Sequence, residues 1–176
     1  HAQLVSDRQI ARPIQRFWTN THTIIGEQEA VVYEMDWPYR QTIAPQVEIS
    51  ARLGDVILLR GFDAQVVGDQ MNLNIYWESV TAVSPSYKVF IHLLDGAGNI
   101  VAQVDRPPVN GLAPTHRWQP GDLVRDPYQI ALPPDLPAGT YELRAGLYTD
   151  ENGRLPVSGG SAVENAAVLT SVEIGD

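Results

Sequence analysis

Residues 86–108 read SYKVFIHLLDGAGNIVAQVDRPP, and this stretch decides the fold. Two runs rich in β-branched and aromatic residues flank Asp95-Gly96-Ala97-Gly98-Asn99, whose residue types suit a tight hairpin loop. Farther along, Pro133-Pro134-Asp135-Leu136-Pro137 separates two more such runs, and proline cannot donate a hydrogen bond to a β-ladder. The stretch therefore predicts antiparallel strands joined by turns.

The same rhythm extends outward over most of the chain. It predicts strands over 46–52, 55–62, 70–78, 86–95, 99–105, 124–132, 140–148 and 166–174. The 13 prolines and 14 glycines among 176 residues indicate frequent turns, and a hydrophobic content of 44% supplies a core. We expect an all-β fold, a two-sheet antiparallel β-sandwich of immunoglobulin-like or jelly-roll-like type with an N-terminal extension.

Residues 1–40 follow a different pattern from the rest. They mix Arg, Gln and apolar residues without clean periodicity, although residues 30–35 favour a β-strand. We expect residues 1–40 to form an N-terminal extension that docks on a sandwich domain of residues 41–176. Trp18 and Trp37 belong to this extension, so docking against the sandwich is the expected role of both indoles.

The composition narrows the class of partner. The formal net charge is −9 and the pI is about 4.8, whereas affinity for nucleic acid needs clustered Lys and Arg. The sequence has no cysteine, which removes disulfides and thiolate chemistry. Its longest apolar runs are far shorter than the roughly 18 residues that span a bilayer. We expect no nucleic-acid partner and no direct membrane insertion of this chain.

Several ordered motifs between residues 53 and 157 carry a resemblance to a known domain. They are YKVFIHLLD (87–95), GNIVAQVD (98–105), G-x-x-P-T-x-x-W-x-P-G-D (111–122), V-x-D-x-Y (124–128), PAGTYELRAGLY (137–148) and GRLPV (153–157). The chain resembles the C-terminal β-sandwich domain of bacterial membrane glycosyltransferases similar to protein mannosyltransferases, and of related uncharacterised exported proteins.

This resemblance implies a function as well as a fold. It implies an extracytoplasmic accessory module, exported or on the outer face of the cytoplasmic membrane, whose partner is the membrane-embedded part of a parent protein. The catalytic acids of those transferases lie in their membrane part, so the resemblance assigns no catalytic residue to this chain. We expect a non-enzymatic domain.

Period-two alternation assigns side chains to faces and suggests a ligand site. If the 70–78, 86–95 and 140–148 strands are neighbours, one outer face carries a mixed aromatic and polar set. Its members are Asn74, Tyr76, Phe90, His92, Arg144 and Tyr148. Aromatic rings stack on sugar rings while amide, imidazole and guanidinium groups bind hydroxyls, so this set suits carbohydrate or lipid-linked glycan. In the alternative interpretation, the aromatic residues pair across strands or lie beneath the extension.

Other chemistry has weaker sequence support. His22, His92 and His116 lack metal-ligand spacing, and His92 near Glu78 or Asp95 could be a general base but better fits a structural histidine. Two clusters could collect calcium, although turn chemistry explains both without a cofactor. They are Asp95 with Asn99 and Asp105, and Asp150 with Glu151 and Asn152.

Two further segments have structural explanations. Ser158-Gly159-Gly160-Ser161 lacks the G-x-S-x-G pattern of a nucleophile elbow and predicts a loop. Trp118 predicts a plug over one end of the sandwich, with its indole N–H satisfied, rather than an exposed stacking residue. The sequence thus favours a non-catalytic accessory module, with carbohydrate or lipid-linked glycan as its candidate ligand. A structural or protein-interaction domain of a larger membrane-associated protein, without a small-molecule ligand, is the alternative.

Overall fold

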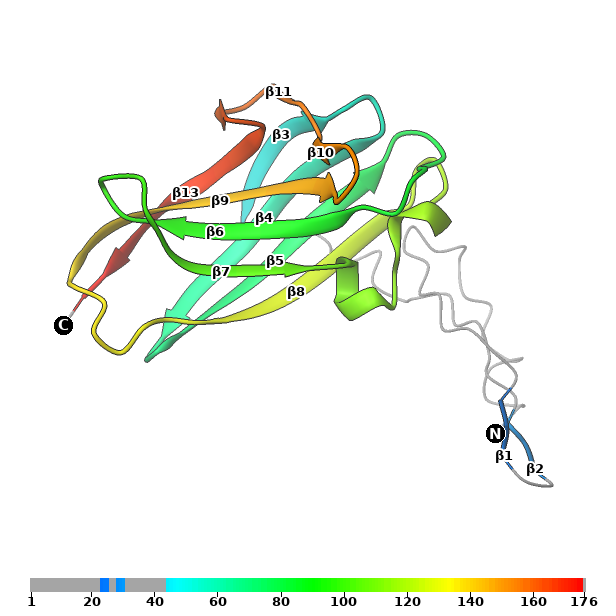
Figure 1. The fold of residues 1–176 in the computed structure, drawn as a ribbon, viewed down its shortest axis with the longest axis horizontal. Helices are drawn as coiled ribbons and strands as arrows, with labels where there is room; N and C mark the ends of the chain where they lie inside the picture. The colour runs from blue at the N-terminus through cyan, green and yellow to red at the C-terminus, as the bar shows by residue number, and fades with distance from the viewer. Residues whose placement is uncertain (1–22, 26–27, 31–43, 176) are drawn as a thin grey trace.

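Two antiparallel sheets face each other in the computed structural model, which describes residues 23–25, 28–30 and 44–175 (Figure 1). Sheet I has the strand order β11-β3-β4-β5-β8, with bounds Val157–Ser158, Val47–Leu53, Ile57–Val67, Gln70–Ser79 and Leu123–Ala131. Sheet II has the order β12-β13-β9-β6-β7, with bounds Ala162–Val163, Ala166–Ile174, Gly139–Thr149, Lys88–Leu94 and Ile100–Arg106. A further strand, β10 (Gly153–Arg154), pairs with β9. The predicted β-sandwich is confirmed.

All eight predicted strand ranges overlap a long strand of the two sheets. The sequence interpretation missed β10, β11 and β12, which are two residues long and lack any alternation to detect. They follow one another after the turn at residues 150–152, and the predicted loop at 158–161 connects β11 to β12.

The core lies between the sheets, where the predicted inward faces meet. On β5, Met71, Ile75 and Trp77 are fully buried, and Ile91 on β6 and Leu147 on β9 are buried from the other sheet. Their polar neighbours point outward because successive strand residues alternate between faces. Burial of each large apolar side chain contributes about 1.5–3 kcal/mol to folding.

One end of the sandwich is closed by the segment that contains η2 (Pro108–Gly111) and η3 (Thr115–Arg117). Trp118 is 1% exposed, and its indole Nε1 donates a hydrogen bond of 2.9 Å to the carbonyl of Ala113. The hydroxyl of Thr115 accepts the backbone N–H of Tyr87 at 2.7 Å and ties this segment to the start of β6. The predicted tryptophan plug is confirmed.

Near the N-terminus, β1 (Thr23–Ile25) and β2 (Gln28–Ala30) pair as a two-stranded antiparallel sheet. The expected docking of residues 1–40, the strand over 31–35 and the positions of Trp18 and Trp37 lie outside the described residues. Within the described ranges, no helix has the length and apolar character needed to cross a membrane.

Candidate functional site

The six residues of the predicted glycan platform fall into two groups. Asn74 and Tyr76 lie on β5 in sheet I, whereas Phe90, His92, Arg144 and Tyr148 lie on β6 and β9 in sheet II. Strands β6 and β9 are neighbours, with His92 opposite Arg144, but β5 pairs with β4 and β8 instead. The two groups therefore occupy the outer faces of different sheets and do not form one surface.

Two members of the sheet II group, Phe90 and His92, are buried by the chain itself. Phe90 is 2% exposed, and the guanidinium of Arg154 lies 4.3 Å from the centroid of its ring. The ring also fills the space beside Gly146, where a Cβ atom would lie 2.4 Å from Phe90 Cζ. Its centroid is 4.9 Å from that of His92 and 6.2 Å from that of Tyr148. Phe90 contacts Tyr148 across the strands, as the alternative interpretation expected. Arg154 lies over its ring, which leaves no free face, and the expected cover by the N-terminal extension lies outside the described residues.

His92 is placed as a structural histidine. Burial lowers its pKa, and the nearby carboxylate of Asp105 opposes this shift. Glu78, one suggested partner, lies in the other sheet. The carboxylate of Asp95, the other, accepts hydrogen bonds from two backbone N–H groups of its own turn, those of Ala97 at 2.9 Å and Asn99 at 2.8 Å. Neither carboxylate completes an acid–base pair with His92.

The suggested calcium clusters are explained by local contacts. Asp105 lies opposite Phe90 near the start of β6, whereas Asp95 follows the other end of that strand. Asp150 accepts the Lys88 ammonium at 2.7 Å. Within the part of the chain that the structure describes, no three His, Asp or Glu side chains gather as metal ligands. His116 lies in η3, and His22 falls outside the described residues.

A groove opens on the outer face of sheet I, where the strand register is irregular. Arg60 has no Cα partner in the β3–β4 or the β4–β5 register, because both ladders shift beside it. The next residue, Gly61, has φ +155°, and a Cβ there would lie 2.3 Å from the carbonyl oxygen of Val47 and 2.5 Å from Pro45. Only glycine lets β3 approach so closely, and the resulting bulge aims Arg60 outward.

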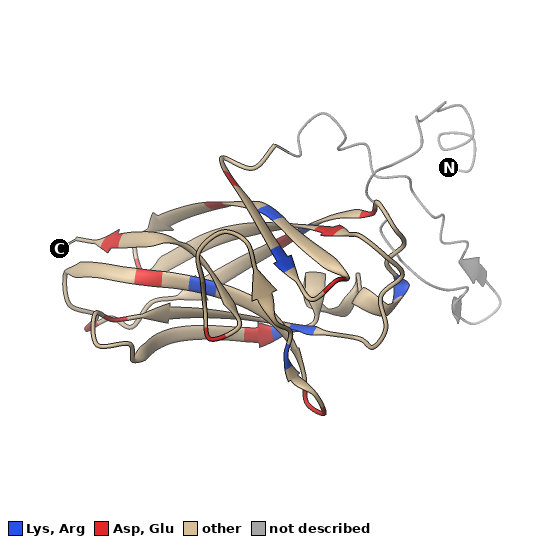
Figure 2. Cartoon of the chain, turned by 90° about the horizontal axis from the view of Figure 1, so that it is seen from above, with Lys and Arg blue, Asp and Glu red and all other residues tan. Residues whose placement is uncertain are grey.

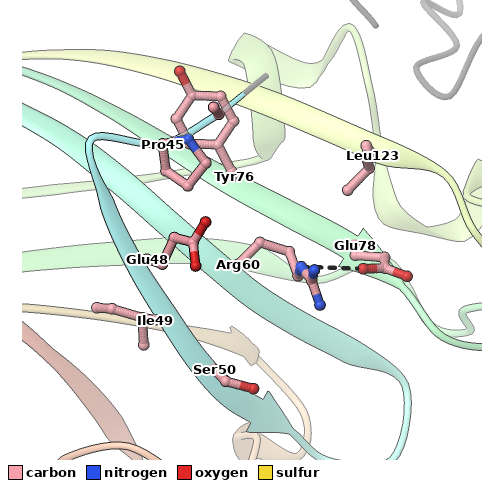
Figure 3. A pocket seen from close by; sticks show the side chains of 9 residues that line it. Pro45, Glu48, Ile49, Ser50, Arg60, Tyr76, Glu78 and Leu123 are labelled. Atoms are coloured by element: carbon pink, nitrogen blue, oxygen red, sulfur yellow. Dashed lines mark ion pairs between the residues drawn. The ribbon is translucent and has the colours of Figure 1, made fainter. Parts of the chain in front are cut away.

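This bulge groove has a volume of about 480 Å³. It is lined by Ala44, Pro45, Glu48, Ile49, Ser50, Arg60, Tyr76, Glu78 and Leu123. Figure 3 shows the carboxylates of Glu48 and Glu78 on either side of Arg60, projecting from three neighbouring strands. Arg60 Nε is 3.4 Å from Glu78 Oε2, and the Arg60 side chain is 53% exposed. The groove therefore presents an acceptor, a donor and a second acceptor in a row.

Asp63 fixes the wall of the bulge groove. Its carboxylate accepts the hydroxyl of Tyr76 at 2.6 Å, the backbone N–H of Gln46 at 2.7 Å and the amide of Asn74 at 3.4 Å. Burial, followed by the bond to Asp63, raises the pKa of Tyr76 to about 12, while Arg125 opposes the shift. Tyr76 is thus a fixed, protonated wall residue, and it is only 3% exposed.

The sequence interpretation found Tyr76 and Asn74 but missed Glu48, Arg60 and Glu78 as a row. One signal was available, because a glycine inside a strand pattern, as at Gly61, marks a bulge or a close backbone approach. No sequence signal placed Glu48 beside Arg60, since their alignment depends on the register shift between β3 and β4.

The fold and this groove define a β-sandwich domain with a polar groove on one outer face. Along the strands that the structure describes, Figure 2 shows basic and acidic residues interspersed. In comparisons with known proteins, no family model matches this chain and no curated protein matches it. The resemblance of the sequence motifs is therefore supported only at the level of the two-sheet antiparallel β-sandwich.

Proposed function

We propose that the domain is a non-catalytic recognition module that binds a glycan in the bulge groove. The observation that carries the proposal is the row formed by Glu48, Arg60 and Glu78 in a groove of about 480 Å³. Carboxylates accept hydrogen bonds from sugar hydroxyls and a guanidinium donates to them, so the row matches a polyhydroxylated ligand. The volume lies within the range of about 300–1,000 Å³ that ligand sites occupy.

The walls of the groove favour a sugar over a small ion. Pro45, Ile49 and Leu123 add apolar surface to the polar row, and a pyranose presents both C–H faces and hydroxyl edges. Arg60 is already paired with Glu78, so a free anion gains no unpaired positive charge there. A neutral, hydroxyl-rich ligand exchanges this pair for hydrogen bonds to both partners.

The setting of the domain follows from the sequence resemblance and remains part of the proposal. An extracytoplasmic module beside a membrane glycosyltransferase would meet glycans or lipid-linked sugars, and the membrane-embedded part of the parent protein would be its partner. Within this proposal, the parent protein performs the chemistry and the sandwich holds or orients the glycan.

One observation favours a second candidate function. Phe90, the central aromatic residue of the predicted platform, is covered by Arg154, and its ring is packed within the fold. A purely structural or protein-interaction domain needs packed faces of this kind and no ligand groove. That role is the alternative if the bulge groove binds nothing.

Affinity electrophoresis tests the proposal across several classes of sugar. The protein is run in native gels that contain one soluble polysaccharide each, from a panel of mannan, glucan, galactan, xylan and a uronic-acid polymer. We expect at least one polymer to retard the protein, and Arg60→Ala to abolish the retardation. Arg52→Ala removes the same charge from β3 outside the groove and serves as the matched control. Equal retardation of wild type and Arg60→Ala would exclude the bulge groove, and no retardation by any polymer would favour the structural alternative.

A further inference from the structure

A second groove lies along the open side of the sandwich, between the edge strands β7 and β8. It has a volume of about 590 Å³ and is lined by Asn72, Leu73, Asn74, Val104, Arg106, Asn110, Pro127, Tyr128 and Gln129. Four of these residues carry side-chain amides, each with two donors and one acceptor. Among the described residues, the amides of Asn72, Asn110 and Gln129 form no hydrogen bond with another side chain or with the backbone, so they are available to a ligand.

The floor of this amide groove is rigid. Asp126 is fully buried, and it accepts the backbone N–H of Val109 at 2.8 Å and the hydroxyl of Tyr128. Arg106 Nη1 lies 3.3 Å from the same carboxylate, and its guanidinium carbon is 3.8 Å from the centroid of the Tyr128 ring. Burial raises the pKa of Asp126, and these hydrogen bonds together with the Arg106 charge oppose that shift. The cluster links β7, η2 and β8 beneath the groove.

The same cluster supports an unusual turn that presents Asn110. Val109 and Asn110 have φ values of 52° and 54°, in the left-handed region that a β-branched residue rarely adopts. Such backbone strain costs about 1–3 kcal/mol and persists only where the surroundings fix it. The bond from the Val109 N–H to Asp126 supplies that fixation, and it holds the exposed Asn110 amide at the rim of the groove.

The amide groove and the bulge groove share two lining strands of sheet I, β5 and β8. Along the outward positions of β5 and β8, Glu78 pairs with Leu123 at the bulge groove, and Asn72 pairs with Gln129 at the amide groove. Between them, Arg125 Nε donates to Asn74 Oδ1 at 3.1 Å. Six residues of strand separate Glu78 from Asn72, a distance of roughly 20 Å.

We propose that the glycan is bound as an extended chain along the outer face of sheet I, with the amide groove as a second subsite. This inference rests on the proposed function, because it extends the ligand of the bulge groove to a second set of contacts. The distance between the grooves exceeds a single sugar ring, and the outward positions between them include the polar side chains of Asn74 and Arg125 beside the exposed Pro127. Free amides bind neighbouring hydroxyls in pairs, so a polymer gains contacts that a monosaccharide cannot reach.

The polysaccharide that retards the wild-type protein provides the test. We expect the double variant Asn72→Ala, Gln129→Ala to weaken retardation by about tenfold, the effect of losing two neutral hydrogen bonds. Gln103→Ala, an exposed amide on the outer face of sheet II, is the matched control. A long oligosaccharide from the same polymer should compete better than its monosaccharide against wild type, and this advantage should shrink in the double variant.

The outcomes separate the two proposals. Retardation that Arg60→Ala abolishes but the Asn72→Ala, Gln129→Ala variant leaves unchanged would overturn the extended-chain inference and keep the bulge groove. Competition that does not depend on oligosaccharide length would overturn it as well. If no polymer retards the wild-type protein, the proposed function is overturned, and the extended-chain inference is overturned with it.

Discussion

The outer faces of the two sheets both carry aromatic residues at outward strand positions, yet the surroundings of these residues differ. On sheet II, Arg154 covers Phe90, whose ring fills the space left by Gly146. On sheet I, Tyr76 is equally buried, but it forms the wall of a groove that leaves Arg60 accessible. An outward aromatic residue is therefore weak evidence for a binding platform. What decides is whether the chain's own segments cover it.

The largest change in the free energy of unfolding is expected at Phe90, and it tests this comparison directly. Phe90→Ala should lower the free energy of unfolding by about 3 kcal/mol, because it removes a fully packed ring from beneath Arg154. Urea denaturation measures the change. Tyr148→Ala, at a half-buried position on the same face, should cost about 1 kcal/mol or less. If Phe90→Ala cost no more than Tyr148→Ala, the ring would not be a packing element and the contrast between the faces would fail.

The next largest loss of stability is expected from substituting a glycine on sheet I. Gly61→Ala should cost about 2 kcal/mol or more, since its Cβ would lie 2.3 Å from the carbonyl oxygen of Val47 and its φ is +155°. Gly68 also has a positive φ, +60°, but a Cβ there meets nothing within 4 Å. Gly68→Ala should therefore cost only the backbone strain, about 1 kcal/mol.

The same pair of variants also tests the shape of the bulge groove. Gly61→Ala forces β3 away from β4 and should abolish polysaccharide retardation even at temperatures where the protein stays folded by circular dichroism. Gly68→Ala should leave retardation intact. Normal retardation by folded Gly61→Ala protein would show that the bulge does not shape the binding surface.

A smaller effect is expected where sheet II is covered. Arg154→Ala removes the guanidinium over Phe90, and a cation–π contact of this kind contributes about 0.5–1 kcal/mol. Thermal unfolding should show a slightly lower midpoint. Lys88→Ala removes an exposed ion pair with Asp150 and a longer cation–π contact of 5.7 Å with Tyr148, and it should change the midpoint less. If a polysaccharide retarded the Arg154→Ala protein but not the wild type, the comparison would be contradicted. The outer face of sheet II would then be a binding surface that Arg154 merely blocks.

The sequence predicts the strands, the core and the tryptophan plug well, because each depends on local pattern. Alternation along β5 places Trp77 inside and Tyr76 outside, whichever strands pair with β5. Loop composition similarly indicates that Trp118 closes one end of the sandwich.

The candidate site could not be predicted in the same way. Whether Tyr76 joins Phe90 on one surface depends on sheet membership, and β5 pairs with β8, whose residues lie far along the chain. Period-two alternation carries no information about such long-range pairing. The row around Arg60 depends in addition on a register shift in two ladders, and only Gly61 hints at it.

The smallest effect expected is a pH dependence on sheet II. Burial lowers the pKa of His92, with Arg154 and Arg144 lowering it further and Asp105 opposing. The unfolded chain then takes up this proton more readily than the folded one, so His92 destabilises the fold as the pH falls below its unfolded pKa of about 6.5. Urea denaturation at about pH 7.5 and at about pH 5.5 covers the range in which a histidine of the unfolded chain takes up its proton. Both pH values lie above the pKa of most carboxyl groups.

In that measurement, His92→Gln should lose less stability than wild type between the two pH values. An identical pH slope in wild type and His92→Gln would mean that His92 is not desolvated in the folded protein. The sheet II face would then be more open than the packing of Phe90 under Arg154 implies, and the distinction between a covered face and a binding face would rest on the grooves of sheet I alone.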